Sequence, residues 1–367
     1  MAGPSKFASS VPEKFVLPTV FASKHSPNFP ELLRRLRVSL MVSSYQAYSV
    51  IFLRGEGEVI KPLYCEFPRP MGMALAPSGA LAVSGETEIH EYRNTPGFAA
   101  RLDPPNRNDA VFLPRRAFVT GALDIHEMAY GEGEELWFVN TLFSCLCTFD
   151  RGSSFVPRWR PKFVSSLAPE DRCHLNGLAM RDQKPFVMTA LGTTDTYEGW
   201  RANKRNGGVA IDFASSEIIA TDFCMPHSPR WHNGKLWILD SGRGALVVVD
   251  LATGKKTDVA RVPGFARGMD FIGPLAVIGL SKLRETNPFV DIPITDDNRD
   301  RLAGIWIVDT RSGQTVALFQ FTEGVDEIFA VNVVGAQLPD MVHDTELLKT
   351  AYILPPSARG STAAGKA

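Results

Sequence analysis

A short segment that recurs six times constrains the fold of this chain more than any other feature. In each copy a pair of polar or small residues precedes an apolar residue, and a strand-like run follows. The copies lie at 70–74, 125–129, 175–179, 228–232, 266–270 and 325–329, with an average spacing of about 51 residues. That spacing fits the four-stranded blade of a β-propeller with long loops better than it fits a helical repeat.

The sequence between the copies predicts short antiparallel strands. Asn233-Gly234 lies between two apolar runs, and this pair is a strong signal for a β-hairpin. Runs at 208–212, 245–250 and 303–309 are typical of outer strands. Little of the chain has the 3.6-residue period of a helix. The repeat and these strands together predict an all-β chain.

The two ends of the chain are expected to meet in one blade. Three strand-like runs, at 38–43, 48–54 and 59–66, precede the first copy of the repeat, whereas no such trio follows the sixth copy. We therefore expect the C-terminal strand to form the inner strand of the blade that the N-terminus begins, which removes free sheet edges. The prediction is a six-bladed β-propeller over residues 38–345, with N- and C-terminal strand closure. Residues 1–37 would form an N-terminal arm with a short helix near 28–37, and residues 346–367 a partly disordered C-terminal tail.

Composition and charge exclude several classes of protein. The net charge is −1, from 39 basic and 40 acidic residues, so there is no electrostatic basis for binding nucleic acid or an anionic membrane. No apolar stretch approaches the roughly 20 residues that span a bilayer, and the N-terminus lacks the apolar segment of a signal peptide. We therefore expect a cytoplasmic protein. Because no Walker or G-x-G-x-x-G motif follows a strand, no nucleotide cofactor is expected.

The five cysteines are expected to be free, buried thiols. No pair has the C-x-x-C spacing of a zinc or redox site. Cys145 and Cys147 would point to the same face of one strand. Free cysteine behaves as a small apolar residue, and its use here fits a reducing compartment.

The functional residues are expected where the inner strands begin, because these strand ends crowd the mouth of the central channel in a propeller. The repeat gathers many ionisable groups there. They must be paired, solvated or bound to a ligand, since burying an unpaired charge costs several kcal/mol. The candidates for catalysis are His126, Glu127, His174, His227 and Glu327, and those for substrate binding are Asn176, Arg230, Arg267, Asp326 and, from the loop at 193–201, Trp200 and Arg201.

Other interpretations of these residues stay open. The axial charges could be ion pairs that only tie blades together, with Arg230 and Arg267 facing Glu127 and Glu327. The loop at 193–201 could be a lid or an ordinary surface loop. A divalent metal could be bound by the histidines that begin three consecutive blades, His126, His174 and His227, because histidine is the commonest metal ligand.

Two resemblances to known families follow from particular strings. The segments His174-Leu175-Asn176-Gly177-Leu178-Ala179 and Gly234-Lys235-Leu236-Trp237-Ile238 resemble the gluconolactonase and strictosidine-synthase-like six-bladed propellers. The lactonases hold an axial divalent ion through Glu, Asn and Asp, and the resemblance implies that Asn176 matches the Asn. The axial Asp falls near Ser228 and Pro229, which cannot replace it.

Longer strings, among them FVNTLFSCLCTFD and MPHSPRWHNGKLW, are similar to a bacterial family of hypothetical proteins that carry a domain of unknown function. This second resemblance spans nearly the whole chain. It implies a propeller but no established reaction and no catalytic residue.

The sequence favours an enzyme that acts on a small organic substrate, which could be anionic, in the axial pocket. The chemistry would be acid/base catalysis of isomerase, lyase, cyclase or hydrolase type. His174, His227 or Glu127 would move protons, and Arg230 and Arg267 would hold an anionic group or stabilise developing negative charge. A divalent metal could assist. The alternative, from another class, is a non-catalytic ligand-binding or protein-interaction propeller.

Overall fold

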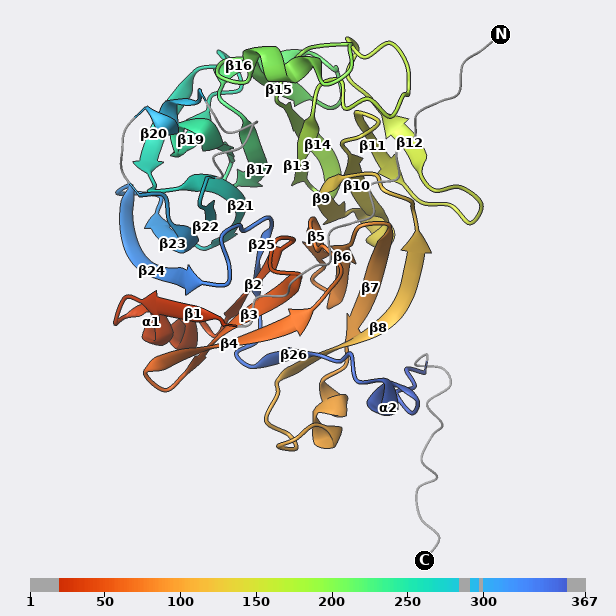
Figure 1. Cartoon of the computed structure of the whole chain (residues 1–367), viewed down its shortest axis with the longest axis vertical. Helices are drawn as coiled ribbons and strands as arrows, with labels where there is room; N and C mark the ends of the chain where they lie inside the picture. Colours follow the sequence, from red (N-terminus) through yellow and green to blue (C-terminus); the bar gives the residue numbers. More distant parts are fainter. Residues whose placement is uncertain (1–19, 284–290, 297–299, 355–367) are drawn as a thin grey trace, which may run out of the picture.

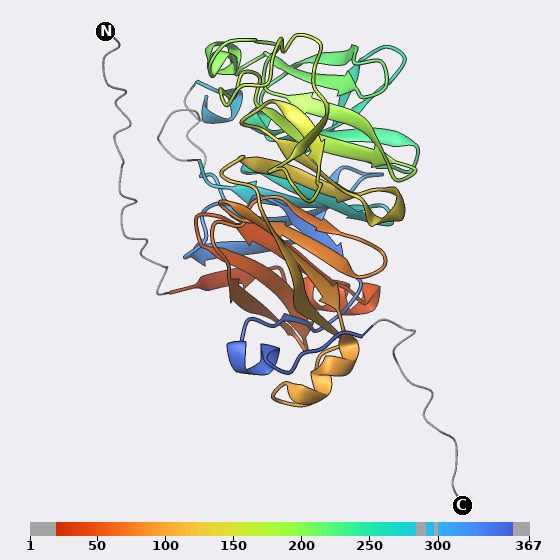
Figure 2. The ribbon, with the colours of Figure 1, turned by 90° about the vertical axis from the view of Figure 1, so that its right-hand side faces the viewer.

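The computed structural model describes residues 20–283, 291–296 and 300–354. Six antiparallel sheets surround a central axis as the blades of a β-propeller (Figure 1). The prediction of an all-β, six-bladed propeller is confirmed. The ring is thinner than it is wide when seen from the side (Figure 2).

Each blade has four antiparallel strands, which are named in order from the axis outward. Blade 1 consists of β25 (Val331–Val334), β2 (Ser39–Ser44), β3 (Ser49–Glu56) and β4 (Val59–Glu66), and blade 2 of β5 (Met73–Leu75), β6 (Ala80–Ser84), β7 (Glu88–Asn94) and β8 (Ala110–Val119). Blade 3 consists of β9 (Ile125–Tyr130), β10 (Leu136–Asn140), β11 (Cys145–Thr148) and β12 (Val156–Trp159), and blade 4 of β13 (Leu175–Arg181), β14 (Lys184–Ala190), β15 (Gly208–Asp212) and β16 (Ile218–Phe223). Blade 5 consists of β17 (Pro226–His232), β18 (Lys235–Asp240), β19 (Ala245–Val249) and β20 (Lys256–Arg261), and blade 6 of β21 (Phe265–Ile272), β22 (Leu275–Ser281), β23 (Ala303–Asp309) and β24 (Gln314–Glu323).

Blade 1 closes the ring as the sequence predicted. Its inner strand β25 comes from the C-terminal part of the chain and pairs antiparallel with β2, with Met41 opposite Asn332. The expected outer strands at 208–212, 245–250 and 303–309 are β15, β19 and β23, which lie third from the axis rather than outermost. The Asn233-Gly234 hairpin is confirmed between β17 and β18. Both turn residues have positive φ, 49° and 72°, as a two-residue hairpin turn requires.

Two short strands extend the ring beyond the predicted blades. β1 (Ala22–His25) pairs antiparallel with β24, and β26 (Pro339–Met341) pairs parallel with β8. Helix α1 (Phe29–Leu36) lies in the predicted helical segment, and Phe29 and Leu33 pack into the core between blades 6 and 1. Asn28 stands at its N-cap, but the side-chain amide donates to the Val316 carbonyl instead of capping the helix. These contacts tie part of the N-terminal arm to the propeller.

A small helical corner lies beside the outer edge of blade 2. Here α2 (Thr345–Leu348) lies next to the 3-10 helix η1 (Pro96–Arg101) (Figures 1 and 2). Leu347 and Leu348 pack against a cluster that contains Phe98, and Arg101 donates to the Thr350 carbonyl at 2.8 Å. The expected disordered tail falls partly on residues 355–367, which lie outside the described residues.

The hydrophobic core of the described residues is divided among the interfaces between blades. Alternate residues of a strand point to opposite faces, so one strand feeds two clusters. In β2, Leu40 and Val42 pack towards blade 6, whereas Met41 packs towards blade 2. Each pair of adjacent blades shares one such cluster. This packing holds the inner strands in a rigid ring.

All five cysteines are free and buried, as predicted. Cys145 and Cys147 lie on the same face of β11, with their sulfur atoms 3.3 Å apart. Within the described ranges, the protein has no helix of the length and apolar character needed to cross a lipid bilayer.

Candidate functional site

The axial site is built from a two-residue spacing that repeats around the ring. Residues i and i+2 of an extended chain point to the same side. In four blades, both the residue at the entry to the inner strand and the residue two positions later line one cavity of about 220 Å³. These pairs are Arg69 and Met71, Asp124 and His126, Met225 and His227, and Phe265 and Arg267. Two other inner-strand entries also line the cavity, through His174 of blade 4 and through Phe329, which precedes the inner strand of blade 1. Loops contribute the remaining lining residues, Tyr45, Trp200 and Arg201.

The entry residues of four consecutive blades have a left-handed backbone. Arg69, Asp124, His174 and Met225 have φ values of 47°, 55°, 49° and 53°. This conformation costs a residue other than glycine about 1–2 kcal/mol. It persists where the surrounding structure enforces it, often at functional sites. Because all four residues line the cavity, the strained positions coincide with the site.

His174 is the best-oriented histidine of the cavity. Its Nδ1 atom lies 2.9 Å from Oδ2 of Asp171, and the indole nitrogen of Trp200 donates to the same oxygen at 2.9 Å. Trp200 belongs to the 3-10 helix η3 (Gly199–Asn203), within the loop that the sequence singled out, and its ring lies 4.5 Å from the His174 ring. Since an ionised carboxylate only accepts hydrogen bonds, Nδ1 of His174 is the donor, and in the neutral imidazole Nε2 is then the acceptor nitrogen.

His126 and His227 are fixed by one local motif. In both blades the carbonyl of the left-handed entry residue accepts a hydrogen bond from the imidazole two positions later. His126 Nδ1 donates to Asp124 and His227 Nδ1 to Met225, each at 2.9 Å. Burial, together with the charge of Arg267, lowers the pKa of both histidines well below the usual value. Both are therefore neutral at pH 7, with Nε2 as an acceptor.

Arg267 supplies the cavity with a positive charge. Its guanidinium carbon lies 3.5 Å from the centre of the Phe329 ring. Burial lowers the pKa of Arg267 to about 9, and the carboxylates of Asp124 and Glu127 oppose this shift. The group stays charged at neutral pH. The prediction that Arg267 faces the axial cavity agrees with this geometry.

Glu327 lies behind the cavity wall and contacts it through Tyr45. The Tyr45 hydroxyl donates to the Glu327 carboxylate. The side chain of Glu327 is only 5% exposed, and burial raises its pKa to about 7. Sequence reasoning selected Glu327 but missed Tyr45, which follows β2 and lies outside the repeat.

Glu127 and Arg230 form an ion pair outside the cavity. The Arg230 guanidinium binds both Glu127 oxygens, at 3.0 and 3.1 Å, and joins blade 3 to blade 5. This is the structural ion pair that the sequence left open as an alternative. In blade 5 the predicted copy of the repeat also lies two residues too far towards the C-terminus. The residue equivalent to His126 is His227, whereas Arg230 lies beyond a bulge in β17.

Two further candidates also lie outside the cavity. Both amide atoms of Asn176 are occupied, since Nδ2 donates to the Pro226 carbonyl and Oδ1 accepts from Thr189. Asp326 forms an ion pair with Lys282 at 2.6 Å and is half exposed. The structure therefore gives Asn176 a role in joining blades 4 and 5, and leaves Asp326 at the surface.

The proposed metal ligands do not converge. No three His, Cys, Asp or Glu side chains in the described part of the chain form a group that could hold a metal ion. His126 and His174 are close, with ring centroids 4.7 Å apart and nearly perpendicular planes, but they contact each other as rings. The arrangement therefore does not support a metal site formed by the three histidines. It also does not support a lactonase-type site, which would need Asn176 as a ligand.

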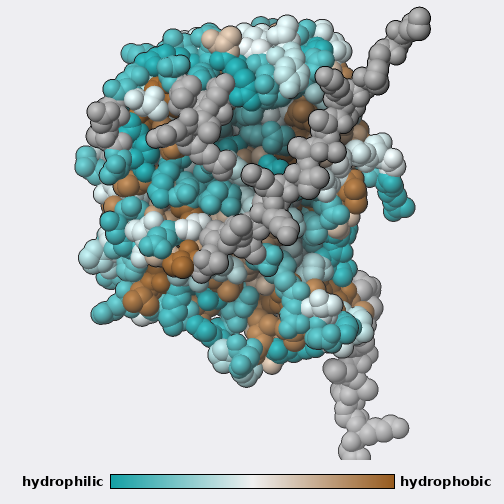
Figure 3. Space-filling view, viewed as in Figure 1, coloured by the Kyte–Doolittle hydropathy of each residue, from teal (hydrophilic) through white to brown (hydrophobic). Residues whose placement is uncertain are grey.

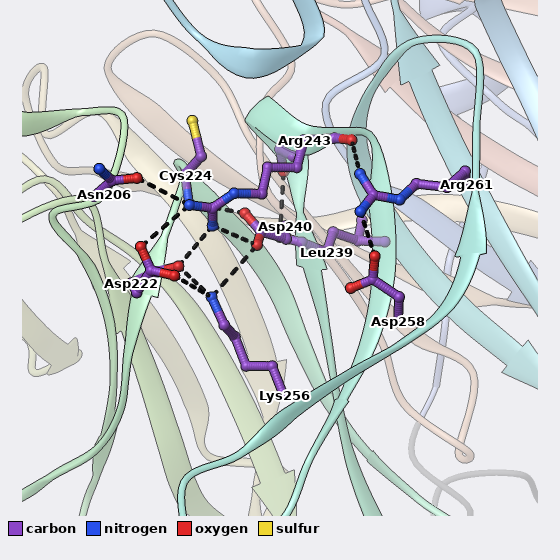
Figure 4. A network of polar contacts seen from close by, with 10 residues as sticks. Asn206, Asp222, Cys224, Leu239, Asp240, Arg243, Lys256, Asp258 and Arg261 are labelled. Atoms are coloured by element: carbon purple, nitrogen blue, oxygen red, sulfur yellow. Dashed lines mark hydrogen bonds and ion pairs between the residues drawn. The ribbon is translucent and has the colours of Figure 1, made fainter.

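A second cavity, of about 470 Å³, lies between blades 5 and 6 and is lined in part by the turns that follow β18 and β20. It is larger than the axial cavity, but two of its lining arginines, Arg243 and Arg261, already bind carboxylates (Figure 4). Arg243 binds Asp240 at 2.8 Å and Asp222 at 3.2 Å, and Arg261 pairs with Asp258. This network joins blade 4 to blade 5, so the axial cavity remains the candidate site.

The surface around the axis is mostly polar. Hydrophilic residues cover most of the face seen in Figure 1, and smaller apolar areas interrupt them (Figure 3). Outside the atoms drawn in grey, that face presents no broad apolar area of the kind that marks a protein interface.

The fold and the site define a six-bladed β-propeller with a cavity of histidines, an arginine and aromatic side chains at its axis. The chain belongs to the DUF4915 family, a domain of unknown function, whose family model matches residues 27–342. The predicted membership of such a family is confirmed. No curated protein sequence matches the chain significantly.

Solved structures share the propeller fold. A chain in the crystal structure of a nidogen/laminin complex is 10% identical, with 81% of this chain and 98% of that chain covered and a TM-score of 0.53. A protein of unknown function from Bacteroides caccae is 7% identical, with 81% and 99% covered and a TM-score of 0.51. A virginiamycin B lyase from Staphylococcus aureus is 11% identical, with 83% and 100% covered and a TM-score of 0.41. At these identities the likeness extends to the fold alone.

Proposed function

We propose that this protein is an enzyme that moves a proton on a small organic substrate bound in the axial cavity. His174 takes the proton at Nε2 and returns it. The proposal rests on one observation, the hydrogen bond between Asp171 and His174, which leaves Nε2 of a cavity-lining imidazole with its lone pair free. A positioned imidazole whose other nitrogen binds a carboxylate is a recurring acid/base arrangement in enzymes.

The other groups of the cavity suit the same chemistry. Neutral His126 and His227 would accept hydrogen bonds from hydroxyl or amino groups of the substrate. Arg267 would bind an anionic group or stabilise negative charge that develops when the proton leaves. The partner is therefore a small molecule. Isomerisation, elimination, cyclisation and hydrolysis all contain a step of this kind.

The test follows proton transfer and does not require a known substrate. The full chain is incubated with a pool of small metabolites in D₂O, and mass spectrometry records which compounds gain deuterium or are consumed. We expect at least one compound to react with the wild type and to react at least about a hundred-fold more slowly with His174→Gln, because a general base typically contributes 10²–10⁴-fold. His90→Gln, which removes a histidine of β7 outside the cavity, is the matched control and should react like the wild type.

A different result would favour the rival function. If no compound reacts, but one co-purifies with the wild type and is retained by His174→Gln, the protein is a non-catalytic ligand-binding propeller. The Glu127–Arg230 pair favours that alternative to a limited extent, because it assigns two of the axial charges to joining blades.

A further inference from the structure

Arg267 differs from the other two arginines that line the axial cavity. Arg69 pairs with Glu86 at 3.0 Å, and Arg201 binds both oxygens of Glu198 at 2.8 Å. The Arg267 guanidinium contacts the face of Phe329, and it has no hydrogen bond or ion pair with the residues that the structure describes. Among the residues that the structure describes, none therefore accepts a hydrogen bond from the five N–H donors of Arg267.

The Arg267 guanidinium is placed to bind an anion. The residue is half-buried, so its donors reach the cavity, and a hydrogen bond to a charged group contributes more than an ordinary hydrogen bond. The planar fork of arginine matches a carboxylate with two parallel hydrogen bonds. Stacking on Phe329 fixes the plane of the fork, which reduces the freedom that binding would otherwise remove.

The charge around the cavity favours an anion of single charge. The charges of Arg69 and Arg201 are already balanced by their glutamates. Asp124 also lines the cavity and interacts electrostatically with Arg267, so one negative charge already lies near the guanidinium. That charge would repel a phosphate dianion more strongly than a carboxylate, which carries a single negative charge.

The remaining walls suit a flat, apolar body. Phe265, Phe329, Trp200, Met71 and Met225 line the cavity beside Arg267. Its volume of about 220 Å³ is below the range of about 300–1,000 Å³ that is typical of drug-sized ligands. The ligand is therefore small, and aromatic or unsaturated carbon would contact these rings over the largest area.

We propose that the substrate of the axial cavity is a small monocarboxylate with a flat, apolar body, whose carboxylate binds Arg267 over the ring of Phe329. This inference rests on the proposed function, because it names the substrate class of the same site. The carboxylate would lie at Arg267, and the apolar body would extend towards His174, whose Nε2 would reach a proton on that body.

Binding of simple probes to the full-length protein tests the substrate class directly. Calorimetry compares benzoate, its neutral analogue benzamide and inorganic phosphate. We expect benzoate to bind saturably, and benzamide and phosphate to bind at least about ten-fold more weakly, since a hydrogen bond to a charged group contributes at least that factor. Arg267→Gln should lower the affinity for benzoate at least about ten-fold. Arg311→Gln, which removes a surface arginine that is 73% exposed, is the charge-matched control and should leave the affinity unchanged.

Some results would overturn the proposal. It is wrong if benzoate and benzamide bind equally, if phosphate binds more tightly than benzoate, or if Arg267→Gln leaves the benzoate affinity unchanged. If Arg267→Gln does not fold, the wild type is tested instead for nuclear Overhauser contacts between benzoate and the Phe329 ring. Contacts support the proposal, and a saturated complex without them overturns it.

The two proposals can fail separately. His174→Gln should still bind benzoate more tightly than benzamide, because Arg267 and Phe329 are unchanged. If benzoate binds as expected but no compound reacts in the deuterium assay, the protein binds a small monocarboxylate but is not the proposed enzyme. If an uncharged compound reacts and the reaction depends on His174, the proposed enzyme is supported and the proposal of a carboxylate substrate is overturned.

Discussion

Asp171 and His174 lie three residues apart and are joined by a hydrogen bond of 2.9 Å between a carboxylate oxygen and Nδ1. The same carboxylate oxygen accepts the indole N–H of Trp200. One acidic side chain thus fixes both the imidazole that would move the proton and the aromatic wall beside it. In the proposed mechanism Asp171 would be a positioning residue, and its removal should change rates without removing the binding site.

Asp171→Asn should slow the deuterium-exchange reaction by up to about 10⁴-fold, the loss that follows when Asn replaces the Asp that orients the histidine of a catalytic triad. Benzoate affinity should change less than about two-fold, since the cavity surface keeps its shape. Rates come from mass spectrometry in D₂O and affinities from calorimetry. Asp150→Asn, which alters an exposed turn, is the control. Equal rates for wild type and Asp171→Asn would remove Asp171 from the mechanism.

Glu127→Gln should lower the free energy of unfolding by about 3 kcal/mol, because it leaves the part-buried Arg230 charge without its partner. Replacing both residues by methionine should cost clearly less, since no unpaired charge remains. Urea unfolding measures both. Glu346→Gln, which breaks an exposed ion pair with Lys349, should cost no more than about 1 kcal/mol. A Glu127→Gln variant as stable as the wild type would show that the pair does not join the blades.

The stability of the protein should depend on pH through Glu327. Burial raises the pKa of this carboxyl from 4.5 to about 7, so the folded state holds the proton more tightly than the unfolded chain. The resulting stabilisation is fully present below about pH 4.5 and is lost as the pH rises through 7. It amounts to about 3 kcal/mol at most, since one pKa unit corresponds to about 1.4 kcal/mol.

Glu327→Gln should flatten that part of the profile, and unfolding free energies at pH 5 and pH 8 measure the effect. Asp326→Asn changes the half-exposed neighbour and should keep the wild-type slope. If the Glu327→Gln profile keeps the wild-type slope, the Glu327 carboxyl does not titrate as the buried geometry requires.

The five thiols should be unreactive in the folded protein. Burial raises the pKa of Cys65, Cys173 and Cys224 to about 12, so they carry almost no thiolate at pH 8. Cys145 and Cys147 are fully enclosed between blades 2 and 3. A thiol-specific chromogenic reagent should release no colour from the native protein and five equivalents in 6 M guanidinium chloride. Rapid reaction of a native thiol would contradict this packing of the cysteines.

The fold could be predicted further than the site. The recurring segment, the Asn233-Gly234 turn and the unmatched strands at 38–66 were enough to predict six blades and their closure. The alignment of the repeat failed where its local pattern is ambiguous. In β17 the polar residues His227 and Arg230 both match the motif, and only the bulge between them decides which one faces the cavity.

The site was predicted in part for the same reason. His126, His174, His227, Arg267, Trp200 and Arg201 line the cavity, as their positions near strand starts and in one loop suggested. Tyr45, Arg69 and Phe329 were missed. A stricter search for residues two apart at each strand entry would have found Arg69 and Phe329, but no sequence pattern marks Tyr45.

The sequence by itself determined the period of the blades, the turns between strands and the closure, because these depend on local alternation and on residues close together in the chain. Only the tertiary structure decided which charges pair and which stay open to a ligand. Glu127 and Arg230 are 103 residues apart, and Tyr45 and Glu327 are 282 apart. Such contacts depend on how the ring closes in space. The position of Arg267 over Phe329, where no carboxylate of the described residues binds it, depends on the same closure.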